Sequence, residues 1–210
     1  MRMQTVTQFV LFVALTAATV SCGDVVRQGR APVFLVIDRL EASRGGPNES
    51  EFIGTLFSDV ITNVTTPAPC TEASPCPTVF ADSGRVTLRL VPKDLGTATA
   101  PSVISTNNEV TIQRYRVSYK RGDGRNSPGV DVPYGFDGGV TGTVAATGSV
   151  VLTFELVRHI AKSEAPLVQL KINPAIIATI AEVTFYGVDR VGNEVTASGN
   201  VLIEFGNFGD

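Results

Sequence analysis

Side chains that could do chemistry are scarce in this chain of 210 residues, in which His159 is the only histidine. A Ser-His-Asp triad or a Cys-His dyad for nucleophilic catalysis would have to use His159. His159 continues the more polar face of an alternating segment at 150–157, which favours an exposed histidine at a strand end. Because one histidine without a cysteine cluster also disfavours a transition-metal centre, we expect no catalytic residue, no metal site and no cofactor.

Three aspartates, Asp123, Asp131 and Asp137, lie in a glycine-rich segment at 121–148. Oxygen ligands from such a loop can hold calcium. The twelve-residue spacing of a calcium-binding loop is missing, and isolated acids in loops usually point into solvent. We therefore expect no bound cation, with calcium as the alternative.

The same segment carries an aromatic pair, Tyr134 and Phe136, among turn residues. Aromatic side chains are enriched at binding hot spots, so this pair is a candidate contact for a partner. The alternative is that both rings fold back and close one end of the domain.

The first 21 residues predict a secretory signal peptide. Arg2 is the only charged side chain before an apolar run at 9–20, and small residues precede Cys22. The run is shorter than the roughly 20 apolar residues that a membrane-spanning helix needs.

The end of this signal, Thr19-Val20-Ser21-Cys22, resembles the lipobox of bacterial lipoproteins, although Thr19 stands where Leu is usual. The resemblance implies cleavage before Cys22, a lipid such as palmitate on that cysteine, and attachment to a membrane. Gly23, not Asp, follows, which by the same resemblance implies the outer membrane. Ordinary secretion without lipidation is the alternative.

With Cys22 assigned to the lipid, Cys70 and Cys76 remain, in a proline-rich stretch at 66–77. An oxidising compartment favours a disulfide between them, which would add about 2 kcal/mol in the chain-entropy model. A metal pair is the alternative, but it would need two further Cys or His ligands nearby, and the stretch has none.

Short apolar or alternating segments along the remaining chain predict eight or nine strands and little helix. The run at 33–37 is apolar on both faces, and the segment at 85–90 alternates cleanly. In 109–120 the apolar phase moves by one residue near Gln113-Arg114, which predicts a β-bulge. Other strands are expected at 52–61, 150–156, 168–172, 182–189 and 194–205, with a short hairpin at 140–145.

One short helix is expected at 175–181. Asn173 is a good helix cap, and Pro174 suits the first helical position. Long loops are expected at 62–84 and 121–148.

The end of the chain resembles the last hairpin of bacterial Ig-like and fibronectin-type sandwiches, because the stretch at 189–193 reads Asp-Arg-Val-Gly-Asn. The resemblance implies an all-β, Ig-like antiparallel β-sandwich with long loops over 33–210, preceded by a tether at 22–32. An inter-sheet disulfide of the Ig type is not expected, since Cys70 and Cys76 are too close in sequence.

The 17 basic and 20 acidic side chains leave a mild negative charge, which argues against a nucleic-acid partner. We expect a cell-envelope protein anchored through Cys22, with a non-catalytic binding or structural sandwich and an envelope protein or polysaccharide as partner. The alternative is a carbohydrate-active enzyme or accessory module using loop carboxylates, which two inward-facing carboxylates within about 5–10 Å of each other in a cleft would favour. A third option, a subunit of a surface assembly, would have a long unpaired edge strand.

Overall fold

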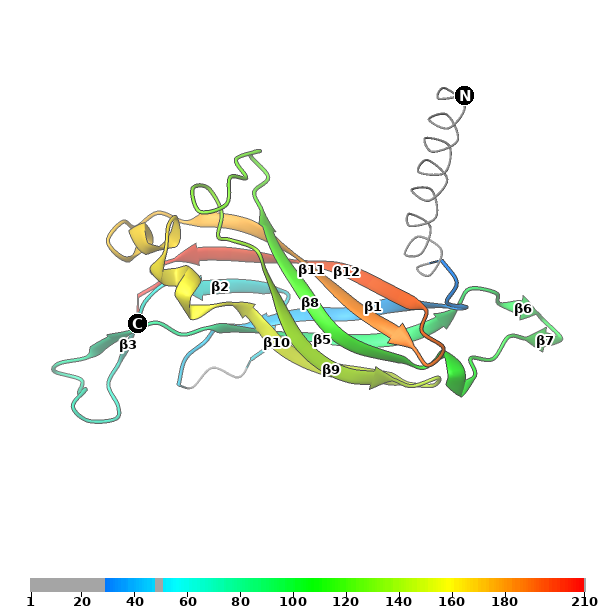
Figure 1. Ribbon diagram of the computed structural model, residues 1–210. Helices are drawn as coiled ribbons and strands as arrows, with labels where there is room; N and C mark the ends of the chain where they lie inside the picture. Colours follow the sequence, from blue (N-terminus) through cyan, green and yellow to red (C-terminus); the bar gives the residue numbers. More distant parts are fainter. Residues whose placement is uncertain (1–28, 48–50, 210) are drawn as a thin grey trace, which may run out of the picture.

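The computed structural model describes residues 29–47 and 51–209, and it consists of two β-sheets that face each other (Figure 1). The predicted signal peptide, Cys22 and most of the predicted tether lie outside the described residues. Within the described part, the only helical segments are short 3₁₀ turns, and no helix there is long and apolar enough to cross a membrane. The predicted all-β sandwich is confirmed.

The smaller sheet has the strand order β1-β5-β10, and the larger sheet has the order β2-β12-β11-β8-β9. All neighbours are antiparallel except β2 and β12, which run parallel. The orders β1-β5-β10 and β12-β11-β8 match the two sheets of an Ig-like sandwich. The strands are β1 (Val33–Ser43), β5 (Asp82–Pro92) and β10 (Ser149–Val157), then β2 (Thr55–Asp59), β8 (Val110–Lys120), β9 (Phe136–Val144), β11 (Ile177–Asp189) and β12 (Glu194–Gly206).

Two small hairpins and three 3₁₀ segments complete the described chain. One hairpin pairs β3 (Thr62–Val64) with β4 (Cys76–Thr78), and the other pairs β6 (Gly96–Thr97) with β7 (Ala100–Pro101). They project from opposite ends of the sandwich (Figure 1). The 3₁₀ segments are η1 (Thr106–Asn108), η2 (His159–Ser163) and η3 (Leu167–Lys171).

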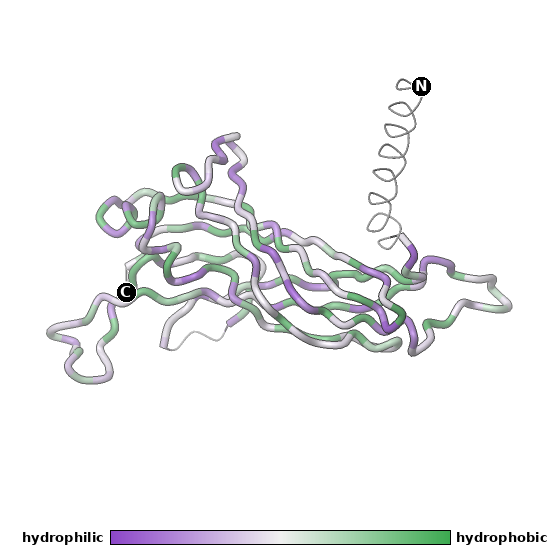
Figure 2. The backbone as a smooth tube through the Cα atoms, viewed as in Figure 1, coloured by the Kyte–Doolittle hydropathy of each residue, from purple (hydrophilic) through white to green (hydrophobic). Residues whose placement is uncertain are grey.

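Alternating side chains build the core between the sheets, and Figure 2 shows hydrophobic and hydrophilic residues alternating along the strands. In β5, Val86 and Leu88 are completely buried, as the sequence pattern predicts. In β8, Ile112 and Arg114 pair with the adjacent residues Gly187 and Tyr186 of β11, so Gln113 is the extra residue of the predicted bulge. It keeps Tyr115, Val117 and Tyr119 on the core side.

The run at 33–37 differs from the prediction of two buried faces. Phe34 is 54% exposed, and its ring centroid lies 5.2 Å from the Lys93 ammonium. Only one face of β1 packs against the other sheet, so Val33 and Leu35 are buried and Phe34 lies on the outside.

The predicted strand at 168–172 is wrong, because η3 occupies that segment. Leu167 and Leu170 are both buried, whereas Ile172 is 93% exposed. Residues three apart share one face of a 3₁₀ turn, so a leucine spacing of three suits this segment better than alternation.

The predicted helix at 175–181 is also wrong. β11 begins at Ile177, and Ile177 to Ala181 pair with β12 from Phe205 to Val201. Hydrogen bonding to a long neighbouring strand outweighs the local helix-start signal at Asn173.

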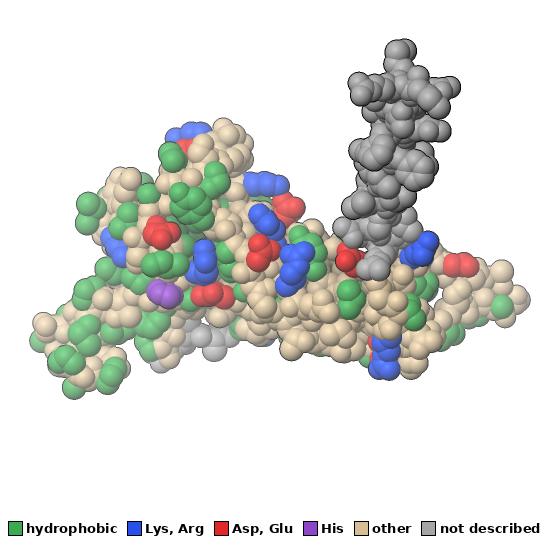
Figure 3. All heavy atoms as spheres, viewed as in Figure 1, with side chains coloured by type: hydrophobic (Ala, Val, Ile, Leu, Met, Phe, Trp, Pro, Cys, Tyr) green, Lys and Arg blue, Asp and Glu red, His purple; other side chains and the backbone are tan. Residues whose placement is uncertain are grey.

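A disulfide between Cys70 and Cys76 closes the tip of the β3–β4 hairpin, as predicted. The residues between the two strands are mostly exposed, and Figure 3 shows hydrophobic side chains gathered on this projecting arm.

Candidate functional site

A cleft opens where two consecutive strands, β9 and β10, part into different sheets. β9 is the edge of the larger sheet and β10 is the edge of the smaller one, and no pairing joins them. Near the turn that connects them, β9 and β10 lie in close contact. Leu152 of β10 packs so tightly on Gly142 of β9 that a Cβ at Gly142 would lie 2.4 Å from the leucine Cδ2. Farther from the turn, the two edges enclose an open cavity.

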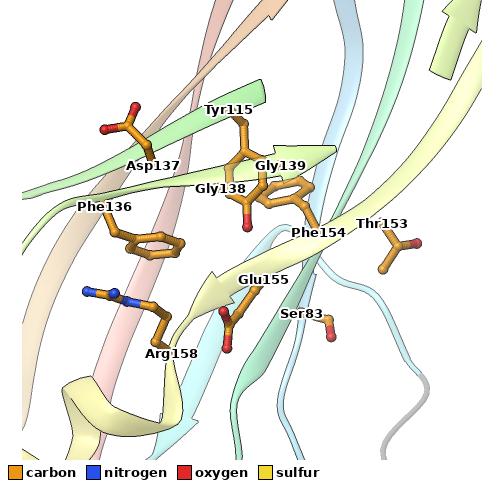
Figure 4. Close-up of a pocket in the computed structure, with 10 residues that line it drawn as sticks. All are labelled: Ser83, Tyr115, Phe136, Asp137, Gly138, Gly139, Thr153, Phe154, Glu155 and Arg158. Carbon is orange, nitrogen blue, oxygen red and sulfur yellow. The ribbon is translucent and has the colours of Figure 1, made fainter. Parts of the chain in front are cut away.

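This cavity has a volume of about 570 Å³, within the usual range for ligand sites. Figure 4 shows its lining, which combines an aromatic floor with polar side chains. The aromatic residues are Tyr115, Phe136 and Phe154; the polar ones are Ser83, Asp137, Thr153, Glu155 and Arg158; Gly138 and Gly139 complete the wall.

The aromatic floor is a packed cluster that continues into the core. The ring centroids of Tyr115 and Phe154 are 4.9 Å apart, and those of Tyr115 and Phe136 are 6.1 Å apart in an edge-to-face arrangement. Phe154 in turn packs 5.2 Å from Phe185, which is completely buried. Burial raises the pKa of Tyr115 above its ordinary value. These contacts fix the rings, so the floor is preformed.

Arg158 forms one end of the cleft, directly after β10. Its guanidinium carbon lies 4.5 Å from the ring centroid of Phe136, which holds the side chain against the floor. Its Nε is buried and has no hydrogen-bond partner in the described part of the chain. A buried donor without a partner costs about 1–3 kcal/mol, so a ligand that accepts a hydrogen bond here would recover that energy.

The two carboxylates of the cleft are not a facing pair. Asp137 accepts hydrogen bonds from Arg114 and Arg116 at 3.3 and 3.4 Å, and Figure 4 shows it pointing away from Glu155. Glycoside hydrolysis needs two carboxyl groups on either side of the scissile bond. This arrangement favours binding over acid–base catalysis.

The structure separates the predicted aromatic pair. Tyr134 is 54% exposed and its ring lies against Gly129, but Phe136 is buried and forms a wall of the cleft. Phe136 points inward from β9, as the fold-back alternative expects, whereas Tyr134 does not. His159 is exposed at the start of η2, as its place in the sequence indicates.

The three aspartates considered for calcium have separate partners. Asp123 lies between Arg121 and Arg125, at 2.7 and 2.8 Å, and hydrogen bonds from these arginines hold its pKa well below the usual range. Asp131 accepts a hydrogen bond from the Ser127 backbone at 3.2 Å. Residues 29–47 and 51–209 contain no group of three or more His, Cys, Asp or Glu side chains that could hold a metal ion.

Sequence reasoning did not find Ser83, Glu155 or Arg158 as site residues. The one available signal was the pair Gly138-Gly139, because adjacent glycines inside a strand often mark a place where something else approaches the backbone.

Comparisons with known proteins found no matching family model, no similar curated protein and no similar solved structure.

Proposed function

We propose that this chain is a lipid-anchored cell-envelope protein whose sandwich binds a ligand in the β9–β10 cleft without catalysing a reaction. The observation that carries this proposal is the buried Arg158 Nε, which has no hydrogen-bond partner among the described residues and lies beside a preformed aromatic floor. The anchor is Cys22, on the grounds of the lipobox resemblance and the signal peptide before it.

The position of the tether supports this arrangement. The Lys93 backbone N–H donates to the Pro32 carbonyl at 2.9 Å, which fixes the start of the described chain beside the end of β5. The cleft residue Ser83 lies at the opposite end of the same strand. Ten strand residues span roughly 30 Å, so the first described residues and the cleft lie at opposite ends of β5.

The chemistry of the cleft suits an acidic saccharide. Hydroxyl groups of Ser83 and Thr153 and the carboxylate of Glu155 offer partners to sugar hydroxyls. Arg158 offers N–H donors that match a carboxylate, since guanidinium groups bind planar anions well. The ligand class we propose is therefore an envelope polysaccharide that carries carboxylate groups.

A blocking variant with a matched control tests the binding site. Thr153 is exposed and lines the cleft, so Thr153→Trp places a large ring in the opening. Thr141→Trp is the control, because Thr141 is an exposed threonine of β9 that does not line the cleft.

The assay is isothermal titration calorimetry of full-length protein in detergent with acidic oligosaccharides prepared from envelope polysaccharide. The wild type and Thr141→Trp should give the same saturable heat, and Thr153→Trp should give none. Equal binding by all three forms would place the ligand elsewhere.

The alternative, a carbohydrate-active enzyme, would have to use Asp137 and Glu155, which line one cleft without facing each other. Incubating the same oligosaccharides with the protein and analysing their length decides between the two. We expect them to remain intact. Shortened products that disappear with Glu155→Gln would establish the enzyme instead.

A further inference from the structure

A lysine and an aspartate form a completely buried pair at the end of the sandwich where η2 follows β10. The side chains of Lys162 and Asp82 are 1% and 0% exposed, and Nζ lies 2.8 Å from Oδ1. Lys162 comes from η2 and Asp82 is the first residue of β5, so the contact joins segments 80 residues apart.

Two further donors hold the Asp82 carboxyl group. Ser58 Oγ donates to Oδ2 at 2.6 Å, and the Gly45 backbone N–H donates to Oδ1 at 2.9 Å. Gly45 can approach this closely because it has no side chain, since a Cβ there would lie 2.0 Å from the Ala81 carbonyl oxygen. The carboxyl group is thus fixed from three directions.

The surroundings of the pair disfavour separated charges. Asp82 pairs with Val157, which is completely buried, and the hydroxyl of the buried Tyr119 donates to the neighbouring Leu156 carbonyl. Desolvation by burial raises the pKa of the Asp82 carboxyl, although Lys162, Ser58 and Gly45 act in the opposite direction. Removing two charges from water costs several kcal/mol per ion, which favours transfer of the proton from the lysine to the aspartate.

From this geometry we propose that Lys162 and Asp82 condense into an intramolecular amide bond. The Lys162 ammonium first gives a proton to the Asp82 carboxylate. The neutral Nζ then attacks Cγ, so that a carbon–nitrogen bond forms. The bond from Cγ to one carboxyl oxygen breaks, and that oxygen leaves as water with a proton from the nitrogen. No oxidant, reductant or other reactant is needed.

The residues around the pair supply what this step requires. The Nζ is already in contact with the carboxyl group whose carbon it attacks, and fixed contact of this kind replaces a high concentration of reactant. Negative charge develops on a carboxyl oxygen in the tetrahedral intermediate, and the Ser58 hydroxyl and the Gly45 N–H already point at these oxygens. The amide bond would link η2 covalently to the smaller sheet. Its lysine, Lys162, is four residues after Arg158 of the cleft.

Peptide mapping of the wild-type, full-length protein tests the proposal. Trypsin cuts after Lys and Arg, so it should separate residues 45–85 from the fragment that begins at His159. With the amide present, Lys162 is not cut, and reduced digests yield one branched peptide of 45–85 joined to 159–171. This peptide is lighter than its two parts by the mass of one water molecule.

Two controls make the result unambiguous. Lys120 pairs with Glu182 on the surface, and its peptide at 117–120 should appear unlinked in the same digest. In Asp82→Asn, ammonia leaves in place of water, and the branched peptide should have the same mass as in the wild type. Free peptides 45–85 and 159–162 from the folded wild type, with no branched peptide, would overturn the proposal.

Discussion

The ring of Tyr115 lies directly on Gly138, so that a β-carbon at that position would come within 2.3 Å of the tyrosine Cζ. Gly138 belongs to an edge strand, yet a core aromatic residue uses the space where its side chain would be. The contact sets the depth of the β9–β10 cleft and brings the tyrosine into its lining.

Gly138→Ala should therefore destabilise the protein. The added methyl group must displace a packed ring, and overpacking of this kind costs about 1–3 kcal/mol in the free energy of unfolding. Gly139→Ala is the matched control, since its Cβ meets nothing within 4 Å. Urea denaturation should show a lower midpoint for Gly138→Ala alone. Equal midpoints for the two variants would show that Tyr115 does not occupy this space.

Because the Lys162–Asp82 pair is buried and the Lys120–Glu182 pair is exposed, replacing the two lysines should reduce the stability of the protein by different amounts. Lys162→Met removes the buried partner of Asp82 and with it the proposed amide bond, and loss of the buried partner alone costs about 3–5 kcal/mol. Lys120→Met removes an exposed partner of Glu182, for which about 0–1 kcal/mol is usual. The midpoint temperature of thermal unfolding should thus fall strongly for Lys162→Met and little for Lys120→Met. A Lys162→Met protein as stable as the wild type would mean that the pair contributes nothing.

Tyr119 predicts a loss of stability at alkaline pH. Burial raises its pKa above the ordinary 10.0, so the folded protein holds the phenol proton more tightly than the unfolded chain does. This contribution is complete below pH 10.0 and is lost as the pH rises from 10.0 toward the folded-state pKa. Tyr115 has a raised pKa as well, for the same reason.

Tyr119→Phe should make the decline above pH 10.0 shallower, without abolishing it, because Tyr115 remains. At neutral pH the variant should lose about 1 kcal/mol, since the Leu156 carbonyl loses its donor at 2.7 Å. The measurement is urea unfolding between pH 8 and pH 11. An unchanged slope in the variant would show that Tyr119 titrates normally in the folded protein.

Much of the sandwich could be predicted from local patterns. Alternation in β5 and the phase shift at Gln113 depend only on which side of a strand faces the core, and that information lies within a few residues. The prediction for 168–172 was wrong because it overlooked the spacing of three between Leu167 and Leu170. The prediction for 175–181 was wrong because that segment depends on a distant partner. Ile177 pairs with Phe205, which no local signal reveals.

The cleft could not be predicted for a related reason. Gly138 and Glu155 come from strands that are consecutive in sequence, and consecutive antiparallel strands usually pair. Here β9 pairs with β8 and β10 pairs with β5, so the cleft exists only because a hairpin is divided between two sheets. Short-range patterns place Arg158 after a strand but do not show that it closes one end of this opening.

The anchor predicts a change in partitioning. Cys22→Ala should remove the lipid, so the variant should move from the membrane fraction to the soluble fraction, and labelled palmitate should no longer enter the protein. Cys70→Ala with Cys76→Ala is the control, because that pair forms a disulfide and should not affect partitioning. A Cys22→Ala protein that remains with the membrane would contradict the lipid anchor and leave the cleft proposal intact.

The central claim is that the cleft binds an acidic saccharide through Arg158. The most direct measurement is the NMR signal of the Arg158 Nε–H, assigned by its loss in Arg158→Lys, during titration with acidic oligosaccharides. The account predicts a saturable shift of this signal in the wild type and no shift in Thr153→Trp. A signal that stays in place while the oligosaccharide binds elsewhere on the protein would contradict it.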